Sequence, residues 1–274
     1  MVINGKTMLY GIVGNPVAHS LSPAIQNAAL ADRDINGVYL PFPALDIEAA
    51  VIGIRGLGVQ GVSVTIPHKE SVMAYLDAID PVAKRIGAVN TIILQEDENG
   101  KSLIGLNTDW LGAVRALEEE TCLDGTEAVL LGAGGSARAI GFGLLERGVH
   151  VVLCSRTESR GRGLANELGC PWVSLADWQQ LSGKILINAT SVGMQPNIAV
   201  SPVPARILPR FQVVMDIVYA PLRTRLLQEA ESAGCKTING LEMLLYQGVA
   251  QFEQWTGRTA PVAVMRKALG DALA

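Results

Sequence analysis

The segment that most constrains the fold is residues 127–147, which read EAVLLGAGGSARAIGFGLLER. A run of apolar residues, predicted to be a buried strand, leads directly into a turn of small residues and then into a segment with apolar residues at helical spacing. Small residues at these positions, G-x-G-x-x-A, let the backbone approach a pyrophosphate at a helix N-terminus. Glycines also form ordinary tight turns, but strand, turn and helix follow here in the order that dinucleotide binding requires. A nucleotide site is therefore predicted at Gly132, Ala133, Gly134, Gly135, Ser136 and Ala137.

The next predicted strand indicates which dinucleotide binds. In NAD sites an acidic residue about 20 residues after the glycines binds the ribose hydroxyls. Here the strand ends in LCSRTESR, which places Ser155, Arg156 and Thr157 at that point, with Arg160 following. A guanidinium binds a 2′-phosphate through charge-assisted bidentate hydrogen bonds, whereas a carboxylate would repel it. The sequence therefore favours NADP as the cofactor; the alternative is that these arginines line a solvated helix start.

Composition restricts the partners. The 274 residues, 49% of them hydrophobic, are enough for two domains with their own cores. The formal net charge of -4 gives no overall positive field for nucleic acid or an anionic membrane, so a small-molecule partner is favoured. The four cysteines and three histidines are too scattered for a zinc site, and we expect no metal and reduced, mostly buried thiols. Because no targeting segment or apolar run near the ~20 residues of a membrane span occurs, we expect a cytoplasmic protein without a membrane partner.

Short apolar runs rich in β-branched residues alternate with segments of helical period along the whole chain. The alternation predicts an α/β fold with mainly parallel strands, divided between two sheets. The predicted strands are residues 8–14, 38–42, 62–66, 88–94, 102–107, 127–133, 150–155, 185–190, 212–219 and 235–239. The predicted helices are residues 22–31, 109–120, 136–147, 222–234, 241–255 and 260–269.

Any catalytic group has to come mainly from the first 110 residues, because hydride transfer needs a proton-exchanging group and the phosphate turn offers none. Polar clusters follow the apolar strands there, in GNPVAHSLSP, SVTIPHK, GAVNT and LNTDW. Parallel strands would deliver these side chains to one rim of a sheet, the usual place for a ligand. Each also has a structural alternative. Ser20 and Ser22 could cap a helix, Asn90 could belong to a turn, Asp109 could be an N-cap, and Lys69 could simply end a strand in solvent.

Together these segments resemble the shikimate dehydrogenase family, nearly end to end. In the family's order they are GNPVAHSLSP, VTIPHK, GAVNT, NTD, GAGGSARA, SRTESR, NATSVGM, DIVYAP and GLEMLLYQG. The resemblance implies reversible, NADPH-dependent reduction of 3-dehydroshikimate to shikimate in chorismate and aromatic amino acid biosynthesis. It implies an α/β substrate-binding domain at residues 1–107, completed by 241–274, and a Rossmann-type NADP-binding domain with a parallel sheet at 108–240. We also allow for a homodimer, in which the partner is a second copy of the chain.

The resemblance also assigns roles to residues. Lys69 and Asp109 would form the catalytic pair, in which an ammonium stabilises negative charge on the reacting oxygen and a neighbouring carboxylate keeps that ammonium charged. The sequence does not decide which of the two delivers the proton. Substrate would be held by Ser20, Ser22, Thr65, Asn90, Tyr219 and Gln247, with both serines on its carboxylate. Besides the residues of the phosphate turn, the cofactor would be held by Ser155, Arg156, Thr157, Arg160, Ile217 and Gly240.

Two departures from the family pattern stand out. Many members have Asn-Val-Thr where this chain has Ser63, Val64 and Thr65, and bacterial members often have Asn where Ser155 stands. Ser63 is expected on the same strand face as Thr65, at the rim of the pocket. Two other functions stay open: a quinate/shikimate dehydrogenase that prefers NAD, against which Arg156 argues, and a non-catalytic nucleotide-binding regulator. Retention of both Lys69 and Asp109 argues against the regulator.

Overall fold

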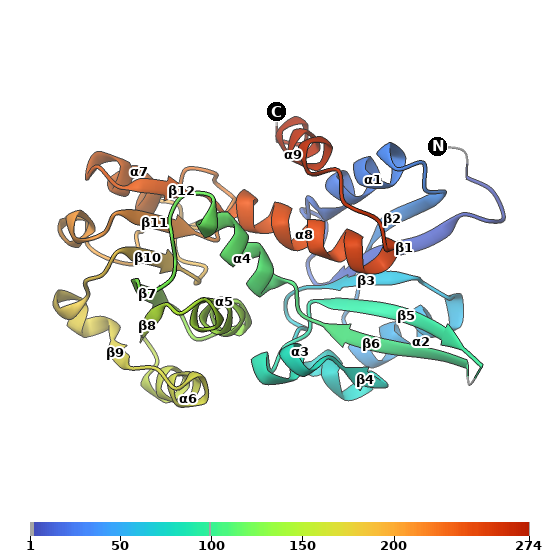
Figure 1. Cartoon of the computed structure of the whole chain (residues 1–274), viewed down its shortest axis with the longest axis horizontal. Coiled ribbons are helices and arrows are strands. Elements are labelled where there is room, and N and C mark those ends of the chain that lie inside the picture. Colours follow the sequence, from blue (N-terminus) through green and yellow to red (C-terminus); the bar gives the residue numbers. More distant parts are fainter. Residues whose placement is uncertain (1–2, 99, 274) are drawn as a thin grey trace. The chain divides into compact units, whose positions relative to one another are not determined.

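A computed structural model of the chain describes residues 3–98 and 100–273. The chain divides into two compact units, each with its own sheet (Figure 1). The first unit comprises Met1–Thr108 and Gln247–Ala274, and the second comprises Asp109–Tyr246. The first unit is therefore built from two separate stretches of sequence, whereas the second is continuous.

The sheet of the first unit is mixed, with strand order β2-β1-β3-β5-β6-β4. Its strands are β1 (Met8–Gly14), β2 (Gly37–Pro43), β3 (Gly61–Val64), β4 (Ala78–Ile79), β5 (Thr91–Asp97) and β6 (Gly100–Leu106). β1 pairs in parallel with β2 and β3, while β5 pairs antiparallel with β3 and β6. Only residues 98 and 99 separate β5 from β6, a connection too short for a parallel crossover. The predicted α/β fold is confirmed, and this sheet is more mixed than the prediction of mainly parallel strands.

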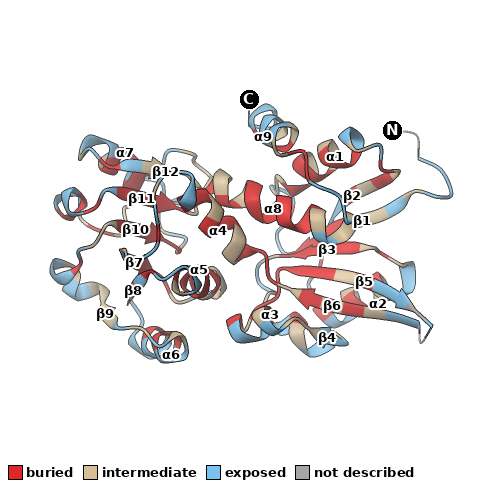
Figure 2. Cartoon of the chain, viewed as in Figure 1, coloured by how far each residue is buried: buried red, intermediate tan, exposed pale blue. Residues whose placement is uncertain are grey.

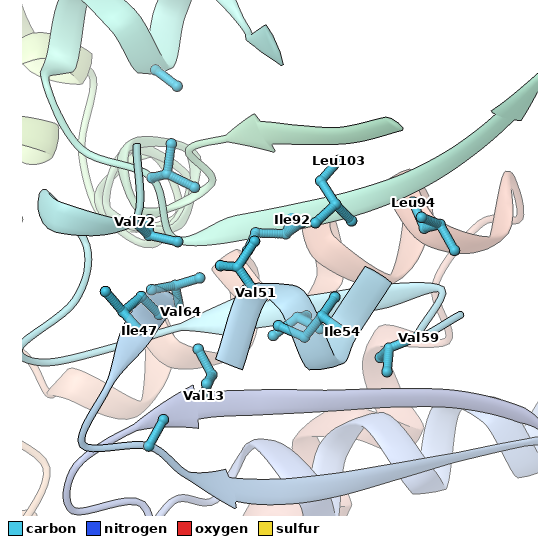
Figure 3. Close-up of a cluster of buried hydrophobic side chains, with 14 residues drawn as sticks. Val13, Ile47, Val51, Ile54, Val59, Val64, Val72, Ile92, Leu94 and Leu103 are labelled. Atoms are coloured by element: carbon cyan, nitrogen blue, oxygen red, sulfur yellow. The ribbon is translucent and has the colours of Figure 1, made fainter. Parts of the chain in front are cut away.

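The core of the first unit lies between this sheet and helix α2 (Ile47–Leu57). Ile47, Val51 and Ile54 recur at helical spacing and are buried against strand residues such as Ile92 (Figure 3). Asp46 caps the helix by accepting from the Glu48 and Ala49 amides, and Gly58 ends it in the left-handed region at φ 66°. Each of these buried aliphatic side chains stabilises the fold by about 1.5–3 kcal/mol relative to an exposed position.

The second unit contains an all-parallel sheet in the order β12-β11-β10-β7-β8-β9. Its strands are β7 (Glu127–Leu131), β8 (His150–Ser155), β9 (Trp172–Ser174), β10 (Ile185–Asn188), β11 (Val213–Asp216) and β12 (Lys236–Ile238). β10 and β11 are buried at every position, as expected for parallel strands covered on both faces (Figure 2). The chain runs outward from β7 to β9 and then returns to β10 on the other side of β7, so the strand order switches between β7 and β10. Open sheets of this kind bind ligands at such a switch point.

Helices connect the strands in both units. The remaining α-helices are α1 (Ser22–Asp32), α3 (Pro81–Ile86), α4 (Asp109–Glu118), α5 (Gly135–Glu146), α6 (Glu158–Leu168), α7 (Arg225–Ser232), α8 (Gly240–Thr256) and α9 (Val262–Asp271). Short 3-10 helices occur at η1 (Ser71–Tyr75), η2 (Leu175–Gln180) and η3 (Ala205–Arg210). The sequence prediction lacked α2, α3, α6, β4 and β9. None of the described helices has the length and apolar character needed to cross a membrane.

Candidate active site

The phosphate-binding turn predicted from the sequence connects β7 to α5. Gly132 has φ 120°, and a Cβ there would lie 2.9 Å from the Ala189 carbonyl oxygen, so a glycine is required. Gly134 occupies the N-cap position of α5 with no side chain capping the helix, and Cβ atoms at Gly134 and Gly135 would meet nothing within 4 Å. The first amide groups of α5 therefore have no side-chain partner from the cap, and the two glycines leave space beside the backbone. Such groups are suited to bind phosphate.

The end of β8 carries the predicted 2′-phosphate residues. Arg156, Thr157 and Arg160 are exposed, and the two guanidinium groups have no carboxylate partner within the described part of the chain. Arg162 differs, because it pairs with Glu158 and lies over the Trp172 ring at 4.4 Å. Arg156 and Arg160 are thus the cations available to an anionic ligand here.

Ser155 lies in the interior next to these arginines. Its hydroxyl donates to the Thr157 carbonyl at 3.2 Å and accepts from the Trp172 indole nitrogen at 3.0 Å. Helix α6 approaches it so closely that a Cβ on Gly161 would lie 2.1 Å from the Ser155 oxygen. The hydroxyl therefore fixes the turn from β8 into α6, and its predicted contact with cofactor stays a prediction.

A buried polar network holds the loops that follow β10 and β11. The Asp216 carboxylate accepts from the Asn188 amide at 2.9 Å, the Val218 backbone at 3.0 Å and the Thr224 hydroxyl at 2.7 Å. Burial raises the pKa of Asp216 to about 6, while these hydrogen bonds act in the opposite direction. The network fixes the segment that contains Ile217 and Tyr219, two of the predicted site residues.

Gly240 and Tyr219 belong to the same region of the second unit. Gly240 begins α8, and a Cβ there would lie 2.2 Å from the Ile217 carbonyl oxygen, so only glycine allows this approach. Tyr219 is half-buried, and burial raises the pKa of its phenol. Its hydroxyl has no hydrogen-bond partner among the described residues, which leaves it available to a ligand.

Lys69 is placed at one edge of the first sheet. The Lys69 carbonyl accepts from the Val89 amide at 2.8 Å, and the preceding His68 ring contacts the Ala44 carbonyl at 2.8 Å through Nε2. Since that carbonyl can only accept, Nε2 of His68 carries the proton. The turn after β3 is therefore anchored on both sides, with Lys69 directly beside the segment that contains Asn90.

Thr65, Asn90 and Thr108 lie at the same edge, because β1, β3 and β6 end there and the antiparallel β5 begins there. The Thr65 hydroxyl has no partner among the described residues, whereas its amide bonds Val13 at 2.9 Å. The Asn90 side-chain oxygen accepts from the Thr108 amide and the Thr91 hydroxyl, both at 2.7 Å. Asn90 is only 2% exposed, so this amide is held rigidly at the strand ends.

Ser20 and Ser22 precede and begin α1. The Ser22 amide donates to the Ser20 hydroxyl oxygen at 3.3 Å, but Leu21 occupies the N-cap position of α1 and no side chain caps the helix, so the capping alternative for the two serines is wrong. This bond uses only the Ser20 oxygen, and its proton has no acceptor among the described residues. Ser22 is 3% exposed, and its side chain lies near the Tyr39 phenol. The Ser20 hydroxyl can therefore still donate to a ligand.

Asp109 and Gln247 stand at the two points where the chain passes between units. Asp109 is 4% exposed and begins α4, in the second unit. Gln247 is 8% exposed on α8, in the first unit, and the next residue, Gly248, accepts from the Gln26 amide at 2.9 Å. The pairing of Asp109 with Lys69 and the substrate contact of Gln247 stay predictions.

Comparisons with known proteins identify the family. Residues 12–92 match the model described as the shikimate dehydrogenase substrate binding domain, and residues 240–269 match that of the shikimate 5'-dehydrogenase C-terminal domain. A shikimate dehydrogenase (NADP(+)) from Moorella thermoacetica is 45% identical over 99% of this chain and 95% of its own length. The chain belongs to the shikimate dehydrogenase family. The family resemblance predicted from the sequence is thus confirmed.

Solved structures of shikimate dehydrogenases share the whole fold. One in complex with NADP+ is 41% identical with a TM-score of 0.92, covering 100% of this chain and 98% of its own. One from Thermus thermophilus, in complex with NADP(H) and shikimate, is 38% identical with a TM-score of 0.90, covering 97% and 100%. The two-unit α/β architecture is therefore that of the shikimate dehydrogenase family.

Several residues that support the shikimate dehydrogenase site were missed by the sequence analysis. They are Tyr39, Thr91, Gln251, Asn188, Asp216 and Thr224. Ser63 is 5% exposed and bonded to Tyr39 and Gln251, and its expected place at the pocket rim stays a prediction. Only Gln251 carried a local signal, since it lies one helical turn after Gln247. For the others, contacts such as those of Tyr39 with Ser63, Thr91 with Gln251 and Asn188 with Asp216 form only in the folded chain.

Proposed function

We propose that this protein is an NADP-dependent shikimate dehydrogenase that reversibly reduces 3-dehydroshikimate to shikimate, in the biosynthesis of chorismate and aromatic amino acids. The observation that carries the proposal is the near full-length similarity, at 45% identity, to an enzyme named shikimate dehydrogenase (NADP(+)). The first unit would bind substrate and the second would bind NADP. In this assignment the substrate-binding domain comprises residues 1–107 and 241–274, and the NADP-binding domain comprises residues 108–240.

The geometry of the second unit supports NADP as the cofactor. The residues of the turn before α5 suit a pyrophosphate, and Arg156 and Arg160 suit a 2′-phosphate, because no carboxylate of the described residues pairs with either cation. Thr157 and Ser155 would complete the binding site for the 2′-phosphate. Ile217 and Gly240 would border the nicotinamide. When bound, NADPH would supply the hydride.

The edge of the first sheet supports the assignment of substrate residues. Ser20, Ser22 and Thr65 offer hydroxyls, and Asn90 and Gln247 offer amides, around the turn that carries Lys69. A carboxylate on Ser20 and Ser22 would orient the ring, and Tyr219 would contribute from the second unit. These groups match the hydroxyls and the carboxylate of shikimate.

The chemical step proposed for Lys69 follows from charge. Reduction of a ketone builds negative charge on its oxygen, and the Lys69 ammonium would stabilise that charge. Asp109 would keep the lysine charged and act as the second proton carrier. A regulator without activity would need neither group, and for this reason we favour the enzyme.

The alternative function is NAD-dependent quinate/shikimate oxidation, and some solved structures similar to this chain are of enzymes in complex with NAD. A quinate dehydrogenase from Corynebacterium glutamicum in complex with NAD is 28% identical, and a shikimate 5-dehydrogenase from Listeria monocytogenes in complex with shikimate and NAD is 35% identical. The unpaired Arg156 favours NADP over this alternative.

NADPH oxidation tests the proposal. The purified protein is mixed with NADPH or NADH and with 3-dehydroshikimate or 3-dehydroquinate, and nucleotide absorbance is followed. We expect the highest kcat/KM with NADPH and 3-dehydroshikimate. Absence of turnover with 3-dehydroshikimate and either nucleotide would refute the proposed function, and faster turnover with NADH and 3-dehydroquinate would establish the alternative. We further propose a cytoplasmic location and a homodimer, which fractionation and light scattering can test.

A further inference from the structure

A row of buried polar side chains crosses the first unit from α1 to the start of β5. Tyr39 is 1% exposed, Ser63 5% and Gln251 0%. The Tyr39 hydroxyl lies 2.6 Å from the Ser63 oxygen, and Ser63 donates to the Gln251 side-chain oxygen at 2.8 Å. The Gln251 nitrogen donates to the Asn90 carbonyl at 3.1 Å and to the Thr91 hydroxyl at 3.0 Å. The row ends at Asn90, one of the predicted substrate residues, and the Ser22 side chain lies near its other end at Tyr39.

Backbone groups fix the direction of every hydrogen bond in this row. The Asn90 carbonyl can only accept, so the nitrogen of the Gln251 amide must face it and the oxygen must face Ser63. The Ser63 proton is therefore committed to Gln251, and Ser63 has to accept from Tyr39.

The hydrogen bonds of Thr91 require the same orientation of the Gln251 amide. The Thr108 amide can only donate, so the Asn90 side chain must present its oxygen to it. Thr91 donates to that oxygen and accepts from Gln251. Two independent backbone groups thus fix one orientation for the whole chain of bonds.

We propose that Tyr39, Ser63 and Gln251 are positioning residues for substrate binding, which hold Asn90 at the end of one directed hydrogen-bond chain. This inference rests on the proposed function, because it concerns the same site. Gln251 binds the Asn90 carbonyl directly, and it also binds the Thr91 hydroxyl that donates to the Asn90 side-chain oxygen. In a buried network of this kind, loss of one member leaves its neighbours unsatisfied.

The ring of Tyr39 is fixed independently of its hydroxyl. It packs against Trp255 at a centroid distance of 5.9 Å, and its backbone exchanges two hydrogen bonds with the Asn27 side chain. Tyr39→Phe therefore removes the phenol oxygen while the ring packing remains. Tyr10 provides a matched control, since it packs on the same Trp255 at 5.8 Å but, among the described residues, its hydroxyl hydrogen-bonds only the Met8 sulfur.

The test compares steady-state shikimate oxidation by the parent with that by Tyr39→Phe, Ser63→Ala, the double variant and Tyr10→Phe. We expect the KM for shikimate to rise roughly 3- to 10-fold in Tyr39→Phe and Ser63→Ala, with kcat and the KM for NADP+ within twofold of the parent, because Asn90 is expected to bind substrate in ground and transition states alike. The double variant should resemble the stronger single variant, because both break one chain. Tyr10→Phe should leave all constants unchanged.

Melting curves verify that each variant is folded. If Tyr39→Phe does not fold, Ser63→Ala decides alone. A folded variant whose KM for shikimate matches that of Tyr10→Phe, or one that changes kcat and both KM values together, would overturn the positioning role. A parent protein that does not oxidise shikimate would instead remove the proposed function and this inference with it, so the two failures are distinguishable.

Discussion

Hydrogen bonds on both sides of Lys69 fix the turn that carries this residue. The His68 ring binds the Ala44 carbonyl, and the Lys69 carbonyl accepts from Val89, so the turn has little freedom even though the side chain itself is half-buried. A rigidly held donor near a developing charge lowers the barrier without reorganisation at the moment of reaction. The fixed turn at Lys69 is therefore what the proposed stabilisation of charge in the transition state requires.

Lys69→Ala should lower kcat for shikimate oxidation by about 10²- to 10³-fold with a much smaller change in KM, because the charge it stabilises develops only in the transition state. Lys84→Ala, which removes an exposed lysine from α3 in the same unit, serves as the control and should leave kcat unchanged. Steady-state rates with saturating substrates, together with a melting curve, measure both. A folded Lys69→Ala variant within threefold of the parent kcat, with chemistry rate-limiting, would exclude the lysine from the mechanism.

Arg156→Ala should raise the KM for NADPH about 10- to 100-fold, since a charge-assisted hydrogen bond is worth roughly 1.5–3 kcal/mol. The KM for NADH should stay the same, because NADH lacks the 2′-phosphate. Arg162→Ala is the matched control on the neighbouring helix, where the guanidinium already pairs with Glu158. An equal increase for NADPH and NADH would show that Arg156 does not recognise the 2′-phosphate.

At the scale of elements, the ends of β10 and β11 are joined by a buried carboxylate. Asp216 is 0% exposed and receives three hydrogen bonds, and burial raises its pKa from 3.8 to about 6. The folded protein therefore takes up this proton more readily than the unfolded chain does. Its contribution to stability is fully present below about pH 4 and is lost as the pH rises through about 6.

Asp216→Asn should remove this pH dependence. The asparagine keeps an oxygen for Asn188 and Val218 and carries no charge, so the free energy of unfolding of the parent relative to the variant should fall by about 2 kcal/mol between pH 4 and pH 7. Urea unfolding of both proteins across this range measures the difference, in which titration of other groups cancels. A difference that is constant with pH would show that Asp216 stays ionised throughout.

Buried strands were the most predictable elements, whereas α2 was missed although its buried face consists of Ile47, Val51 and Ile54. Strands such as β10 read as unbroken apolar runs and were predicted within two residues. Helix α6 was not, because its buried face consists of Gly161, Leu164 and Ala165 within a polar segment. At the site, polar residues at strand ends were predicted. The side chains that hold them were not, because Tyr39 and Gln251 find their partners through the fold.

At the scale of the whole molecule, the first unit depends on the C-terminal segment. Trp255 donates to the Ile92 carbonyl at 3.0 Å and packs so closely on β3 that a Cβ on Gly61 would lie 2.4 Å from it. Gln251 satisfies the Asn90 carbonyl and the Ser63 hydroxyl in the same sheet. Residues 1–108 without α8 would expose this apolar surface and these polar groups.

We therefore expect a fragment of residues 109–246 to unfold cooperatively by circular dichroism, and a fragment of residues 1–108 to show no cooperative transition. Adding a peptide of residues 247–274 to the second fragment should restore a transition. Cooperative unfolding of residues 1–108 alone would show that α8 and α9 are not needed for that core.

The division of the first unit into two stretches also sets an order of events during translation. As the chain leaves the ribosome, residues 1–108 appear first, but the helix that covers their sheet is among the last segments to be made. The continuous second unit can reach its final structure in the meantime. The part of the protein synthesised first thus matures last, and during that interval its nascent strands are the natural target for chaperones.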